Sequence, residues 1–190
     1  MDSSTNYLES TKKLFRYYKT VGDAVIERTD EQGLHWQYNE ASNSLAVIIK
    51  HISGNSISRW TDFLTSDGEK DSRDRDDEFE DTGITKPQLT ELWEKGWACL
   101  FNAIDPLVAA DLTKTVYIRN EGHTVLEAMN RQLAHLPYHI GQMVMLGKML
   151  SGNNWQSLTI PKGQSKTYNN NKFSAEKKTQ FFTDGMQEGK

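Results

Sequence analysis

The residues of this sequence best suited to chemistry are three of its five histidines. His135 and His139 lie four positions apart in a segment with helical periodicity, so their side chains project from one helix face and can hold one metal ion. His51 lies in an earlier apolar segment, where a ligand from a neighbouring helix would be expected. All three flank apolar stripes, which favours a metal site. The alternative is that these imidazoles only bond to neighbouring carbonyl groups.

Two amides lie at helical steps from these histidines. Asn55 follows His51 by one turn, and Gln132 precedes His135 by three residues. Either side chain can orient a ligand or substrate, or serve only as a local hydrogen-bond partner. A zincin peptidase is not expected, because its HExxH signature requires Glu at position 136 and this chain has Leu136. The sequence singles out no catalytic residue.

Apolar residues recur with helical spacing in four long segments, at about 6–28, 44–64, 86–104 and 124–150. Thr124 and Glu127 form a capping-box pattern at the start of the last helix, and Pro137 lies between its two histidines. Residues 113–120 have the character of a short extended piece. We therefore expect an all-α four-helix bundle with one crossover in residues 1–152. Residues 153–190 are expected to form an irregular, partly disordered C-terminal tail.

Composition excludes several classes of protein. The chain has 190 residues, of which 36% are hydrophobic and 25% charged, and no apolar run approaches the ~18 residues that span a bilayer. Nine acidic and three basic residues fall between positions 67 and 81, and this stretch is expected to be a solvated loop. No basic cluster indicates nucleic-acid binding. A single cysteine and the absence of a signal-peptide pattern favour a cytoplasmic location.

The sequence resembles the DinB/YfiT-like proteins, which are antiparallel four-helix bundles with a three-histidine metal site. The resemblance lies in His51, in the segment QLAHLPYHIGQ at 132–142 and in the helix order, and it covers about residues 6–150. It implies that His51, His135 and His139 ligate one divalent metal ion. Zinc or nickel is favoured, with iron and manganese as alternatives. It also implies a homodimer.

Characterised relatives of that superfamily transfer low-molecular-weight thiols, so the resemblance implies a small-molecule substrate and a thiol such as bacillithiol. Three protein ligands leave a position open for such a thiol, whose thiolate is already the nucleophile. We therefore predict a metal-dependent transferase that adds the thiol to a small electrophile. The alternatives are a hydrolase that uses metal-bound hydroxide and a non-catalytic protein with a structural metal.

Overall fold

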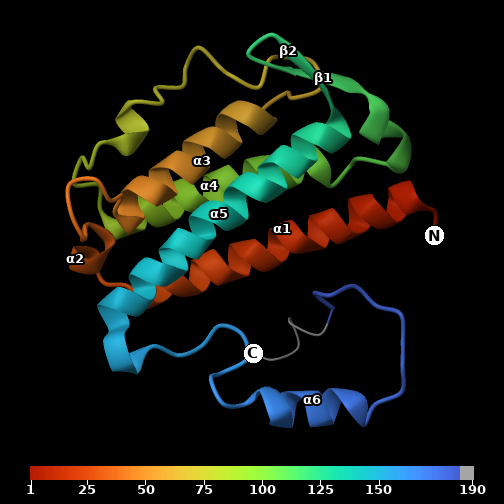
Figure 1. Cartoon of the computed structure of the whole chain (residues 1–190). Helices are drawn as coiled ribbons and strands as arrows, with labels where there is room; N and C mark the ends of the chain where they lie inside the picture. The colour runs from red at the N-terminus through yellow and green to blue at the C-terminus, as the bar shows by residue number, and fades with distance from the viewer. Residues whose placement is uncertain (185–190) are drawn as a thin grey trace.

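The computed structural model of the chain describes residues 1–184 and is mostly helical (Figure 1). Its four long helices are α1 (Ser3–Arg28), α3 (Leu45–Trp60), α4 (Lys86–Ile104) and α5 (Val125–Ser151). Helix α3 packs against α4 and α5, and α1 packs against α5 and α4. Each long helix therefore contacts two others around a shared core, which confirms the predicted all-α class.

The helices begin where the sequence offers capping side chains. The Asp2 carboxylate accepts a hydrogen bond from Thr5 N–H at the start of α1, and the Ser44 hydroxyl accepts one from Val47 N–H at the start of α3. The capping box of α5 is confirmed, because Glu127 N–H donates to Thr124 Oγ1 at 3.1 Å and Thr124 N–H donates to the Glu127 carboxylate at 2.7 Å. Side-chain oxygens thus satisfy amides that the first helical turn leaves unpaired.

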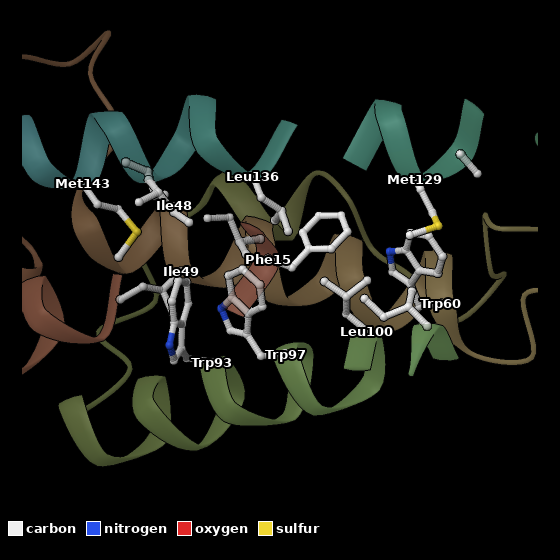
Figure 2. Close-up of a cluster of buried hydrophobic side chains, with 14 of the residues drawn as sticks. Phe15, Ile48, Ile49, Trp60, Trp93, Trp97, Leu100, Met129, Leu136 and Met143 are labelled. Atoms are coloured by element: carbon white, nitrogen blue, oxygen red, sulfur yellow. The ribbon is translucent and has the colours of Figure 1, made fainter. Parts of the chain in front are cut away.

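The core lies between the four helices and is rich in aromatic side chains. Figure 2 shows tryptophans from α3 and α4 facing residues of α5. The α5 members Met129, Leu136 and Met143 repeat every seven residues, the spacing that keeps side chains on one helix face. The same repeat explains why the periodicity of the sequence located this helix.

A long connection joins α3 to α4. In Figure 1 the two helices run in the same direction, so residues 61–85 must return along the length of α3 before α4 begins. We call residues 61–85 the crossover; the sequence predicted one crossover but did not assign it to these residues. It contains the short 3₁₀ helix η1 (Asp77–Phe79), which contacts α3. The acidic stretch therefore covers α3 rather than extending into solvent as a separate loop.

Helix α3 ends at Trp60, four residues before the predicted end near residue 64. Thr61 is extended, and Asp62 has a φ of 49°, in the left-handed region that interrupts a helix. Phe63 is nevertheless buried, with its ring centroid 5.0 Å from that of Trp60. The apolar spacing persisted beyond the helix because the following turn also packs into the core.

The extended piece predicted at 113–120 is one half of a hairpin. Strand β1 (Thr115–Ile118) pairs antiparallel with β2 (Glu121–Thr124), and β2 leads directly into α5. The turn residues Arg119 and Asn120 both have positive φ values, and their amides donate to the Asp67 carboxylate at 2.8 Å. Because the turn is held by a residue distant in sequence, no local pattern indicated the turn or the second strand.

The remaining short elements are α2 (Glu31–Leu34), η2 (Ala109–Thr113), η3 (Gly152–Asn154) and α6 (Ser165–Phe173). The predicted irregular tail contains the short helix α6, which has no buried residue and no amphipathic period by which the sequence could have indicated it. Residues 185–190 of the predicted tail lie outside the described part of the chain. Within residues 1–184, no helix is both long and apolar enough to cross a membrane.

Candidate metal centre

The structure brings His51 of α3 together with His135 and His139 of α5. One imidazole nitrogen of each residue lies within 4.8 Å of those of the other two, and the Nε2 atoms of His51 and His135 are 3.1 Å apart. Two nitrogens bound tetrahedrally to one zinc ion, each at about 2.05 Å, are separated by about 3.3 Å. The three histidines therefore lie close enough to bind a single metal ion.

The site favours the neutral imidazoles that metal binding requires. Burial lowers the pKa of His135 to about 3, and the nearby charges of His139 and His51 add to this effect. Burial, followed by the charge of His51, lowers the pKa of His139 to about 4. Nδ1 of His139 is buried and has no hydrogen-bond partner among residues 1–184.

A carboxylate orients His51. Nδ1 of His51 donates to Glu78 Oε2 at 2.9 Å, which leaves the lone pair of the neutral ring on Nε2, facing His135. Arg73 holds the same carboxylate through Nε at 2.7 Å and Nη2 at 2.8 Å. Burial by itself would raise the pKa of Glu78, but the hydrogen bonds from His51 and Arg73 keep it below its ordinary value. This carboxylate–histidine arrangement is the usual support of a metal-bound imidazole.

Gly54 makes room for this support. A Cβ atom at position 54 would overlap the Glu78 carboxylate, so a side chain there would displace it. On another side of the site, the Phe79 ring lies 4.8 Å from the His51 ring, centroid to centroid. The acidic segment thus supplies both a charged partner and an apolar cover for His51, although composition alone indicated a solvated loop.

The two amides singled out in the sequence are both buried beside the histidines. Asn55 is 5% exposed and Gln132 is fully buried. Asn55 Oδ1 and both side-chain polar atoms of Gln132 lack a hydrogen-bond partner in the described chain. Buried amides normally find partners within the protein or in water. Such atoms could pair with an ordered water or with a bound ligand.

Sequence reasoning missed Glu78 and Arg73. Nine acidic residues crowd positions 67–81, and no periodicity distinguishes one of them. The only available signal was general, namely that a metal-binding histidine commonly donates its other nitrogen to a carboxylate. This general rule does not indicate which of the nine acidic residues binds His51.

Other candidate residues lie elsewhere. His35, at the end of α2, binds the Asp81 carboxylate at 2.8 Å through Nδ1. Across residues 1–184, the three-histidine cluster is the only group of at least three potential His, Cys, Asp or Glu ligands close enough to share an ion. A surface cleft of about 620 Å³ between the ends of α1 and α5 is lined by Arg28, Trp36 and Trp155, among others, and by none of the three histidines. We place the chemistry at the histidines because the cleft lacks a comparable group of ligands.

A family model described as "Protein of unknown function (DUF1572)" matches residues 2–164. The chain belongs to this family. The match includes all four long helices and the three histidines. No curated protein and no solved structure matches the chain significantly.

Proposed function

We propose that this protein is a DinB-like four-helix bundle that binds one divalent metal ion through His51, His135 and His139 and transfers a low-molecular-weight thiol to a small electrophile. The observation that carries the proposal is the cluster of three convergent imidazoles without a fourth protein ligand in the described chain. Three-ligand zinc sites keep a position for a substrate, whereas four-ligand sites are closed.

The neighbouring carboxylate does not close the site. Glu78 is engaged by His51 Nδ1 and by the Arg73 guanidinium, so it supports a ligand instead of acting as one. Imidazole donors suit zinc and nickel, and also iron. We favour zinc or nickel.

When bound, the metal would lower the pKa of a coordinated thiol and so supply a thiolate at neutral pH. The thiol proton passes to solvent, the sulfur forms a bond to the electrophilic carbon, and the leaving group departs with its electron pair. The chain's own contribution is positional. Glu78 and Arg73 fix the His51 ring, and we expect the Asn55 and Gln132 amides, about one turn from His51 and His135 along their helices, to hydrogen-bond a substrate.

Metal analysis of the purified protein tests the ligand set. We expect one equivalent of metal in the wild type and a large loss in His51→Ala, His135→Ala and His139→Ala. His123→Ala is the matched control, because this histidine lies on β2 outside the cluster and should leave the metal content unchanged. Full metal content in the cluster variants would refute the ligand set.

Conjugation assays test the reaction. Metal-loaded protein, metal-free protein and His139→Ala would each be mixed with bacillithiol or another small thiol and a panel of electrophiles. Faster conjugation by the loaded wild type alone supports the transferase, and equal rates in all three refute it. Hydrolysis of esters or amides without thiol would instead support the hydroxide alternative. Stabilisation by metal with neither reaction would support a structural role.

A further inference from the structure

Arg59, in the last turn of α3, is a largely buried cation with no anionic partner among residues 1–184, and Nε is the one atom of its guanidinium that is fully buried without a hydrogen-bond partner there. Its side chain belongs to a residue only 8% exposed, its Nε has no hydrogen-bond partner, and none of the ion pairs within residues 1–184 includes its guanidinium. Lys50 is equally buried, but its Nζ donates to the carbonyls of Asp77 and Glu80 at 2.7 and 2.9 Å. Because a buried charge is costly unless it is paired, Arg59 requires an explanation.

Other positively charged residues surround Arg59. Burial lowers the pKa of Arg59 to about 10, and the charges of Arg131 and Arg73 act in the same direction. Glu69 is the nearby acidic group that favours the charge of Arg59, but Arg73 and Arg119 already bind its carboxylate at 3.4 and 3.2 Å. Positive charge from α3, α5, the crossover and the hairpin turn is therefore concentrated around Arg59. Such a concentration attracts anions.

Arg59 belongs to a polar stripe that begins at the metal centre. His51, Asn55 and Arg59 follow one another at four-residue steps and so share one face of α3. Helix α5 runs opposite to α3 in Figure 1, so Gln132 lies on the same side of the histidines as Asn55 and Arg59. Asn55 Oδ1, Arg59 Nε and both polar atoms of Gln132 are buried without partners in the described chain.

We propose that Arg59, together with Gln132, binds a carboxylate group of the substrate held at the metal centre. A guanidinium can donate two parallel hydrogen bonds to a carboxylate, and the unpartnered NH₂ group of Gln132 can donate another, whereas Asn55 Oδ1 can only accept a hydrogen bond from another part of the substrate. At 1.5 Å per residue, Asn55 and Arg59 lie about 6 and 12 Å from His51 along the axis of α3. The substrate is therefore a small acid whose carboxylate is separated by several bonds from its metal-binding atom. This inference uses the proposed function only for the identity of that atom, a thiol sulfur.

Matched thiols test the carboxylate separately from the sulfur. The affinity of zinc-loaded protein for 6-mercaptohexanoate and for 6-mercaptohexanol would be measured by calorimetry, since the two differ only in the terminal acid. We expect the acid to bind at least about tenfold more tightly, the effect of one charge-assisted contact. Arg59→Gln should remove this preference and leave the affinity for the alcohol unchanged. Arg59→Lys should keep part of the preference, because it retains the charge but loses the forked geometry.

Arg131→Gln is the control for a diffuse positive field, because this arginine is exposed and acts on Arg59 only through its charge. It should change the preference less than twofold. Equal binding of acid and alcohol by the wild type would overturn the proposal, as would an equal loss of preference in Arg59→Gln and Arg131→Gln. Removing an unpaired buried charge should not unfold the protein, so Arg59→Gln is expected to keep its metal content and its far-ultraviolet circular dichroism.

Succinate has carboxylates but no thiol, so its binding distinguishes failure of the carboxylate site from failure of the proposed transferase. If neither thiol binds but succinate raises the melting temperature of the wild type and not of Arg59→Gln, the carboxylate site stands and the thiol chemistry fails. If both thiols bind equally in all variants, the sulfur site stands and the carboxylate site fails. Absence of any Arg59-dependent effect from thiol acids and succinate alike refutes the carboxylate site.

Discussion

Replacing Glu78 with glutamine tests how the outer support of His51 contributes to metal binding. The carboxylate accepts hydrogen bonds on both oxygens, since Oε2 accepts from His51 and Arg73 and Oε1 accepts from Arg73. A glutamine amide has one acceptor oxygen and one NH₂ group. In either orientation of the amide, its NH₂ group would therefore face a donor of His51 or of Arg73.

The expected loss is large because the contact is buried. The side chains of His51 and Glu78 are 7% and 8% exposed, so water cannot replace the lost hydrogen bond. Loss of such a support typically weakens metal binding 10- to 100-fold, which corresponds to about 1.4–2.7 kcal/mol. The metal-free protein should also lose stability, by about 1–3 kcal/mol, because a buried donor of Arg73 loses its acceptor.

Zinc affinity would be measured by competition with a chromophoric chelator, and the stability of the metal-free protein by urea unfolding. Glu80→Gln is the control, since it makes the same charge change two residues away on an exposed side chain. It should behave as the wild type in both assays. If Glu78→Gln and Glu80→Gln bind zinc with the same affinity, the support of His51 by Glu78 does not affect the metal centre.

Three further predictions concern the site and the assembly. Gly54→Ala should weaken zinc binding about as much as Glu78→Gln, because the added Cβ displaces the carboxylate, and unchanged affinity in the chelator assay would contradict this. Metal-free protein should lose stability as the pH falls from about 6.5 towards 4, because unfolded histidines take up protons that folded His135 and His139, with pKa values of about 3 and 4, do not. Urea unfolding across this range should show a shallower pH dependence in a His135→Gln/His139→Gln variant, and equal slopes would refute the assignment. Light scattering at micromolar concentration should give the mass of a homodimer, and a monomer mass would remove that prediction.

The sequence by itself determined the four long helices and how two of the three histidines, His135 and His139, lie relative to each other. Helical period and capping are local properties, so α1, α4 and α5 were placed within a few residues from apolar spacing and from pairs such as Thr124 and Glu127. The four-residue step between His135 and His139 likewise followed from one helix. The proximity of His51 was an expectation that rested on the packing of two helices.

Tertiary structure alone decided which other residues belong to the site. Glu78 reaches His51 across 27 positions of sequence, and no local pattern distinguishes it from its acidic neighbours. The hairpin turn depends in the same way on the distant Asp67. The isolation of Arg59 is also a property of the folded chain, because only packing shows which carboxylates other arginines have already taken. Residue spacing predicts which side chains share one face of a helix or strand. The pairing of a buried charge depends instead on every element that packs around it.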